Sequence, residues 1–166
     1  MKVSVLSSGS KGNTTYIESN FSEIENAIAK VKSKLKDYVN SGNIKKNLLV
    51  VDDSNIIINY IENIVKENYN VVRANNGIEA INKLNENIYA MLLDINMPKS
   101  NGIDVLKYLT DNDLMDKVPV VIITGNDTKD AIKEVLGYSV LDVLNKPFSV
   151  DNIKRVLSLI ENFHNN

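Results

Sequence analysis

Five polar residues of this chain lie at or just beyond the ends of short apolar runs, and their types are those that hold a cation and a phosphoryl group. They are Asp52 and Asp53 after the run 48–51, Asp94 after 91–93, Thr124 after 120–123, and Lys146 shortly after 140–144. Clustered carboxylates are ligands of hard cations such as Mg²⁺. An ammonium group and a hydroxyl group neutralise and contact phosphoryl oxygens. These residues would form a site for phosphoryl transfer if the run ends met in space.

The apolar runs alternate with amphipathic stretches of helical length, which predicts a parallel α/β fold. We expect strands at 47–52, 70–74, 90–94, 118–124 and 140–144, and helices at about 55–67, 77–86, 102–110, 128–137 and 149–162. Strict alternation implies right-handed crossovers and a doubly wound five-stranded parallel sheet. Ligands of such sheets bind outside the carboxyl ends of the strands, so the polar residues should share one rim. The strand at 70–74 is the least apolar and should lie at an edge.

The chemistry expected at this rim is phosphorylation of a carboxylate. Asp94 is the candidate nucleophile, because a carboxylate beside a cation can be phosphorylated directly to an acyl phosphate. Calcium is a weaker fit than Mg²⁺, since no loop has the alternating oxygen ligands and terminal Glu of an EF-hand. Each residue alone is more often part of a turn or a solvated strand end. Their joint occurrence at four strand ends is what supports a function.

Four motifs at these strand ends resemble the receiver domain of bacterial two-component response regulators. They are Asp52-Asp53, Asp94-Ile95-Asn96-Met97-Pro98 followed by Gly102, the run from Pro119 to Thr124-Gly125, and Asn145-Lys146-Pro147-Phe148. The resemblance covers about residues 46–164, and the spacings between the motifs agree with the family pattern. It implies a flavodoxin-like sheet with strand order 2-1-3-4-5, preceded here by an N-terminal helical extension.

The resemblance also implies a role for each residue. Asp52 and Asp53 become acids that hold Mg²⁺, Asp94 the phosphoacceptor and metal ligand, Asn96 a metal ligand through its backbone carbonyl, Thr124 the switch hydroxyl, and Lys146 the phosphate-binding lysine. The Lys146-Pro147 bond is expected to be cis, a minority form of such bonds. The family usually has Tyr or Phe three residues before the lysine, where this chain has Val143. The usual aromatic movement coupled to the hydroxyl is not expected in that form.

The composition excludes several classes of protein. The chain has 166 residues, a net charge of −2 and no cysteine. It therefore lacks a basic field for nucleic acid, a disulfide scaffold and thiolate metal ligands. The apolar runs fall far short of the ~20 residues that span a bilayer, and the chain does not begin like a signal peptide. We expect a cytoplasmic protein that contacts neither membrane nor nucleic acid directly.

The part before the predicted receiver domain at 46–166 divides into a segment at 1–20 and a helix with its linker at 21–45. Residues 1–18 have the pattern of a strand and a Ser- and Gly-rich loop, with no visible helix, and resemble the start of metallo-β-lactamase-fold hydrolases. That fold needs a His-rich metal motif, whereas the only histidine here is His164, expected to be a solvated terminal residue. Residues 1–20 are interpreted as a relic or a disordered segment.

The helix predicted at 21–38 carries an apolar seam whose members are three and four residues apart. The apolar seam consists of Phe21, Ile24, Ile28, Val31, Leu35 and Tyr38. Ser22 and Glu25 have capping-box spacing at its start, as do Asn76 and Glu79 further on. A seam of fewer than three heptads favours packing on its own domain over a coiled coil. A homodimer through helix 21–38 or through the 128–148 face is the alternative.

The leading functional interpretation is a phosphoacceptor receiver module. It would take a phosphoryl group from a sensor histidine kinase or a histidine phosphotransfer protein and catalyse only its own phosphorylation and dephosphorylation. Since the helix at 149–162 ends the sequence, it is expected to act by switching the binding of a downstream protein. One alternative is a receiver-like dimerisation or scaffold module that is never phosphorylated. A weaker one is an aspartyl-nucleophile phosphatase, which would need a second Asp where this chain has Asn96.

Overall fold

The structure is a computed structural model of the chain, and it describes residues 11–38, 45–84, 87–97, 102–125 and 129–165. The chain divides into two compact units, Met1–Ile44 and Lys45–Asn166. In the described residues, the first unit contributes one long helix, and the second unit contains all of the strands.

The second unit is built on a five-stranded sheet. Its strands are β1 (Lys46–Val51), β2 (Tyr69–Ala74), β3 (Ile88–Asp94), β4 (Val120–Thr124) and β5 (Asp142–Asn145). Their spatial order is β2-β1-β3-β4-β5, and every neighbouring pair is parallel. This order confirms the predicted doubly wound sheet. The less apolar β2 lies at an edge, as predicted.

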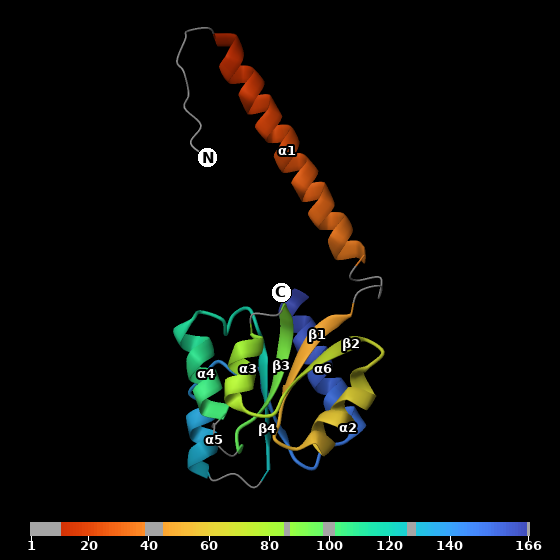
Figure 1. Cartoon of the computed structure of the whole chain (residues 1–166), viewed down its shortest axis with the longest axis vertical. Coiled ribbons are helices and arrows are strands. Elements are labelled where there is room, and N and C mark those ends of the chain that lie inside the picture. Colours follow the sequence, from red (N-terminus) through yellow and green to blue (C-terminus); the bar gives the residue numbers. More distant parts are fainter. Residues whose placement is uncertain (1–10, 39–44, 85–86, 98–101, 126–128, 166) are drawn as a thin grey trace. The chain divides into compact units, whose positions relative to one another are not determined.

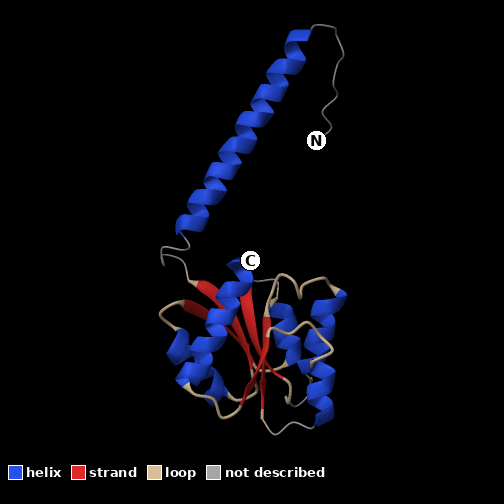
Figure 2. Ribbon diagram, turned by 180° about the vertical axis from the view of Figure 1, so that it is seen from behind, coloured by secondary structure: helices blue, strands red, loops and turns tan. Residues whose placement is uncertain are grey.

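Helices cover both faces of the sheet, as a parallel sheet requires. They are α2 (Asn55–Val65), α3 (Gly77–Lys83), α4 (Gly102–Asp111), α5 (Lys129–Val135) and α6 (Val150–Asn165). Figure 1 shows α3, α4 and α5 on one side of the sheet and α2 and α6 on the other, and Figure 2 shows the same layers from behind. Neighbouring residues of β1 belong to different cores: Leu49 packs with the α4 side, whereas Leu48 packs with the α6 side. Alternation along the strand therefore fills both faces.

The N-terminal helix is longer than predicted. α1 spans Lys11–Tyr38, so the prediction that residues 1–20 form only a strand and a loop is wrong for residues 11–20. In the sequence, Ile17 stands four residues before Phe21 and continues the spacing of the apolar seam. The loop-like Ser and Gly residues nearby masked that signal. Residues 1–10, where the strand was predicted, lie outside the described residues.

Other local predictions also have a clear outcome. Asn76 caps α3, because its side chain accepts a hydrogen bond from the Glu79 N–H at 2.9 Å. Ser22 lies inside α1 and therefore does not start it. β5 begins at Asp142 rather than at 140. Among the described helices, none combines the length and the apolar character that a membrane crossing requires.

Candidate functional site

The carboxyl ends of four strands place the predicted polar residues along one rim of the sheet. Asp94 is the last residue of β3, and Thr124 is the last residue of the adjacent β4. Asp52 follows β1 directly, and Lys146 follows β5 directly. The rim therefore gathers two acids, a hydroxyl and an ammonium group from four separate strands, where parallel topology locates ligand sites.

Three carboxylates lie close together at this rim. One oxygen of each of Asp52, Asp53 and Asp94 lies within 4.8 Å of the other two. Asp52 is fully buried and Asp94 is 3% exposed, whereas Asp53 is exposed. Like charges at this separation repel one another, and more strongly where water is excluded. The cluster therefore needs positive charge.

Lys146 supplies part of that charge. Its Nζ lies 2.7 Å from Asp52 Oδ2 and 2.7 Å from Asp94 Oδ2. Burial lowers the pKa of Lys146, but its hydrogen bonds to Asp52 and Asp94 outweigh burial and hold the pKa above its usual value. Burial raises the pKa of Asp94, and Lys146 opposes that rise only in part. Among the described residues, one ammonium group meets three carboxylates, so this part of the rim keeps an excess of negative charge.

Backbone amides orient the two buried carboxylates. The Ser54 N–H donates to Asp52 Oδ1 at 2.8 Å, and the Asn96 N–H donates to Asp94 Oδ1 at 3.2 Å. In both hydrogen bonds, an Asp side chain accepts from the backbone N–H two residues further along the chain. This arrangement forms a turn that Asp favours where a chain leaves a strand. Each carboxylate thus has one oxygen on an amide and the other on Lys146. The role of the Asn96 carbonyl as a metal ligand stays a prediction.

The Thr124 hydroxyl lies buried at the same rim without a hydrogen-bond partner. Thr124 is 1% exposed, and its Oγ1 has no partner among the described residues. Leaving a buried polar group unpaired costs about 1–3 kcal/mol, so such groups are rare and call for an explanation. The hydroxyl can therefore donate to a group that binds at the rim.

Gly102 is a residue of the site whose structural role sequence reasoning missed. A Cβ at this position would lie 2.5 Å from the Asp94 carbonyl oxygen and 2.8 Å from Ile95 Cα. The Gly102 N–H donates to the Ile95 carbonyl at 3.2 Å. Only glycine lets α4 begin this close to the strand end that carries Asp94. The sequence signal was the position of Gly102 in the Asp94 motif, which does not reveal the close approach of the two backbones.

Strand β5 and the peptide bond that follows its end bear on two features of the family pattern. The Lys146-Pro147 bond is cis, as predicted. Val143 is partly buried in β5 and packs against the same apolar cluster as Ile132 and Tyr138. An aliphatic side chain therefore fills the strand position where a ring was expected from the family pattern.

The donor set at the rim fits a hard divalent cation. All three acidic side chains offer oxygen, and their spacing allows one ion to contact several of them. The excess negative charge would attract such an ion, and the exposed Asp53 leaves room for the water ligands that Mg²⁺ keeps. The residues present therefore fit Mg²⁺.

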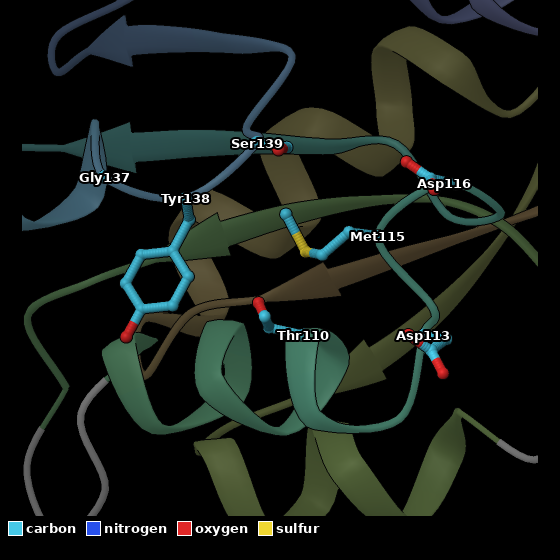
Figure 3. A pocket seen from close by; sticks show the side chains of 7 residues that line it. All are labelled: Thr110, Asp113, Met115, Asp116, Gly137, Tyr138 and Ser139. Carbon is cyan, nitrogen blue, oxygen red and sulfur yellow. The ribbon is translucent and has the colours of Figure 1, made fainter.

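A hollow elsewhere in the second unit is separate from the carboxylates. It has a volume of about 240 Å³ and is lined by Thr110, Asp113, Met115, Asp116, Gly137, Tyr138 and Ser139. Figure 3 shows these residues at the end of α4 and on the segments that lead into β4 and β5. It lies at the amino ends of those strands, opposite the end that carries Thr124. It is not part of the carboxylate site.

Comparisons of sequence identify the family of the second unit. The family model for the response regulator receiver domain matches residues 48–158. The transcriptional regulatory protein CpxR homolog of Haemophilus influenzae is 38% identical over 117 residues, which make up 66% of this chain and 49% of that protein. The chemotaxis protein CheY1 of Helicobacter pylori is 32% identical over 117 residues, which make up 68% of this chain and 94% of that protein. The chain thus spans about half the length of the CpxR relatives.

Solved structures agree with this assignment. The receiver domain of the Francisella response regulator 1452 has a TM-score of 0.62 and 32% identity, covering 71% of this chain and 98% of that chain. A CheY-like receiver domain protein from Methanospirillum hungatei has a TM-score of 0.64 and 26% identity, covering 74% of this chain and 100% of that chain. The sheet order, the rim of carboxylates and the matched residues lead to one conclusion: this chain belongs to the response regulator receiver domain family of two-component systems.

Proposed function

We propose that this receiver domain accepts a phosphoryl group on Asp94 from a phosphohistidine of a sensor histidine kinase or a histidine phosphotransfer protein. The observation that carries this proposal is the position of Lys146, whose Nζ lies 2.7 Å from Asp94 Oδ2 and 2.7 Å from Asp52 Oδ2. An ammonium group in this position can pass from carboxylate to phosphoryl oxygens without a large movement. It supplies the charge neutralisation on which phosphoryl transfer depends.

In the transfer, a carboxylate oxygen of Asp94 attacks phosphorus. The O–P bond forms while the N–P bond to the donor imidazole breaks, and the electron pair of that bond returns to the imidazole nitrogen. The Asn96 amide holds the carboxylate in place, and the Thr124 hydroxyl donates to the arriving group. Mg²⁺ held by Asp52, Asp53, Asp94 and the Asn96 carbonyl would neutralise charge on the phosphoryl oxygens.

The phosphoryl group would act as a switch because it changes the partners of two rim residues. Thr124 would gain the hydrogen bond that its buried hydroxyl lacks, and Lys146 would exchange carboxylate contacts for phosphoryl contacts. Movement of these residues would alter the adjoining surface, and so the affinity for a downstream protein. A ligand shifts such an equilibrium only by its differential interaction with the two states.

The direct test is phosphorylation of the Asp94→Asn variant by acetyl phosphate in the presence of Mg²⁺, followed by intact-mass spectrometry. We expect wild type to gain one phosphoryl group and Asp94→Asn to gain none, because the change removes the nucleophile at nearly constant volume. Asp104→Asn is the matched control, since Asp104 is an exposed acid in the first turn of α4. It should be phosphorylated like wild type.

Two results would contradict the proposal. Equal phosphorylation of wild type and Asp94→Asn would move the nucleophile elsewhere. No phosphorylation of folded wild type by acetyl phosphate or by a phosphohistidine donor would favour the scaffold interpretation. Circular dichroism of each variant checks that the fold is intact. A phosphatase of this type would need an acid at position 96, where this chain has Asn96. Multiple turnover of a phosphomonoester by the chain would support the phosphatase interpretation.

The valine at position 143 leads us to expect a modest output through the 128–148 face. No ring can follow the Thr124 hydroxyl inward, so the two states should differ little there. Sedimentation of a 45–166 fragment with and without beryllofluoride, a phosphoryl mimic, measures this. We expect at most a weak increase in self-association. Strong dimerisation of the fragment on adding the mimic would show that Val143 does not weaken the switch.

A further inference from the structure

The helix α1 presents large apolar side chains to its surroundings. In the apolar seam, the exposed fractions are 65% for Phe21, 55% for Ile24, 49% for Ile28, 56% for Val31 and 53% for Leu35. The residues between them are mostly polar or charged. A continuous row of exposed apolar groups of this kind marks an interaction surface.

The spacing of the apolar seam and the length of α1 suit pairing with a second α1 helix. Phe21, Ile28 and Leu35 occupy the first core position of successive heptads, and Ile24 and Val31 occupy the fourth. α1 has 28 residues, which is about four heptads. The objection that the apolar seam covers fewer than three heptads counted the seam from Phe21. The helix begins at Lys11, and with Ile17 at a fourth position the seam from Ile17 to Tyr38 covers about three heptads. Most of the stability of a helix in a protein comes from packing of its apolar face.

The distribution of charge along α1 distinguishes a parallel from an antiparallel pairing of two such helices. Most acids and most lysines occupy different halves: Glu18, Glu23 and Glu25 come first, and Lys30, Lys32, Lys34 and Lys36 follow, with Lys11 and Asp37 as the exceptions. A parallel pair would place the lysine-rich halves side by side. An antiparallel pair places the acidic half of each helix against the lysine-rich half of the other. We propose that two copies of this chain associate through α1 as an antiparallel helix pair.

The heptad positions give the register of this pair. Ile28 of one copy packs in a layer with Val31 of the other, and Ile24 packs with Leu35 of the other. Glu25 and Lys32 both hold the fifth heptad position, and they lie between the same two layers. Two-fold symmetry therefore produces two Glu25–Lys32 pairs between the copies. In a parallel pair, Lys32 would face Ala27 instead. Association through α1 does not depend on phosphorylation of Asp94, so it goes beyond the proposed function.

Sedimentation of the full chain tests the association. We expect wild type to be a dimer and Ile28→Lys to be a monomer, because the substitution places two charges in the centre of the seam. Ser33→Lys is the matched control, since position 33 lies on the opposite side of the helix, and it should stay dimeric. A monomeric wild type, or an Ile28→Lys variant that still dimerises, would overturn the proposal. Phosphorylation of each variant by acetyl phosphate reports separately on the receiver domain.

Charge reversal tests the register. Glu25→Lys alone should weaken dimerisation about tenfold, because two attractive pairs become repulsive. The double variant Glu25→Lys/Lys32→Glu should restore the wild-type affinity. No change in the single variant, or no recovery in the double variant, would contradict the Glu25–Lys32 contact.

Disulfide cross-linking tests the orientation of the two helices. Because the sequence has no cysteine, only the introduced cysteines can form a disulfide. Under oxidation, Ile24→Cys and Leu35→Cys should each stay uncross-linked alone, whereas an equal mixture should form a disulfide-linked dimer. Ser33→Cys, on the far side of the helix, should not cross-link. Efficient cross-linking of either seam variant with itself would show a parallel pair and overturn the antiparallel proposal.

Discussion

Two lysines at opposite ends of the same sheet have similar exposure and very different surroundings. The side chains of Lys146 and Lys46 are 23% and 22% exposed. Lys146 contacts two carboxylates that are nearly fully buried, Asp52 and Asp94. Lys46 contacts Glu161 at 2.6 Å, and the side chain of that acid is 37% exposed. The clearest contrast between the two lysines therefore lies in their partners.

The end of the sheet with Lys46 is balanced in charge and in hydrogen bonds. Glu161 accepts from Lys46, from the Tyr69 hydroxyl at 2.5 Å and from the Tyr89 hydroxyl at 3.0 Å. Lys46 Nζ also lies 4.2 Å from the centre of the Tyr89 ring, within the range of a cation–π contact. One cation meets one anion, and neutral hydroxyl groups supply the remaining donors. We call Lys46, Tyr69, Tyr89 and Glu161 the tyrosine cluster.

The carboxylate rim is unbalanced in both respects. It has more acids than cations, and the Thr124 hydroxyl has no partner among the described residues. The pKa directions agree: the pKa of Glu161 is lowered because its hydrogen bonds to Lys46 and the tyrosines outweigh burial, whereas burial raises the pKa of Asp94 despite Lys146. Perturbed, incompletely paired groups are typical of functional sites. The tyrosine cluster ties α6 to the sheet, whereas the rim keeps unpaired groups and an excess of negative charge.

The largest difference should appear when each lysine is replaced by methionine. Lys146→Met leaves two buried carboxylates without their cation, and we expect it to lower the free energy of unfolding by about 2–3 kcal/mol. Lys46→Met leaves Glu161 with two hydroxyl donors and water, so we expect a loss below about 1 kcal/mol. Urea denaturation of both variants without Mg²⁺ measures the contrast.

Two further measurements on the same variants sharpen the contrast between Lys146 and Lys46. Mg²⁺ should recover much of the lost stability in Lys146→Met and none in Lys46→Met. Phosphorylation by acetyl phosphate should slow by about 10²-fold or more in Lys146→Met and stay unchanged in Lys46→Met. Equal destabilisation by the two substitutions would show that the buried acids do not depend on Lys146.

A smaller effect is expected from glycines at the rim. Gly102→Ala would place a Cβ 2.5 Å from the Asp94 carbonyl oxygen, and relief of that overlap should cost about 1–3 kcal/mol. Gly125→Ala is the matched control, because nothing lies within 4 Å of its Cβ position. Thermal unfolding of both variants is the measurement. If Gly102→Ala matched Gly125→Ala, the close approach of α4 to β3 would not constrain the rim.

The two ends of the sheet also differ in how far the sequence predicted them. Asp52, Asp94 and Lys146 follow apolar runs, so strand order alone brings them together. The tyrosine cluster joins residues at 46, 69, 89 and 161, and no motif or run end links them. His164 was predicted to be solvated. It is exposed, but its ring stacks on Tyr89 with a centroid distance of 3.9 Å, a contact that depends on where α6 ends over the sheet.

The start of α1 and the role of Gly102 could not be predicted for different reasons. Lys11 to Asn13 resemble a loop in composition, and local propensity is a weak guide where packing of an apolar seam stabilises a helix. Gly102 is required by an approach of two backbones, which periodicity does not encode. The parallel orientation of β1 to β5 followed from the alternation of strands with helices, and the central strands β1, β3 and β4 are apolar enough to be buried on both faces.

The exposed acid of the rim should have a modest effect on stability and a larger one on metal binding. Asp53→Asn removes one of three like charges, so the metal-free protein should become slightly more stable. The same change removes an anionic ligand, and we expect Mg²⁺ to bind at least about tenfold more weakly. Calorimetric titration and urea denaturation give both values. Unchanged Mg²⁺ affinity would place the ion away from Asp53.

The smallest effect is expected from pH at the tyrosine cluster. The folded pKa of Glu161 lies below its usual value of 4.5, because hydrogen bonds to Lys46, Tyr69 and Tyr89 outweigh burial. Folding therefore favours the ionised form, so the contribution of Glu161 is present above pH 4.5 and is lost as the pH falls through the folded pKa. Glu161→Gln should be less stable than wild type at neutral pH by under about 1 kcal/mol, and the gap should narrow in acid. A gap that stayed constant from neutral pH to below 4.5 would mean that the Gln variant is weakened by packing rather than by loss of a charge that the cluster stabilises.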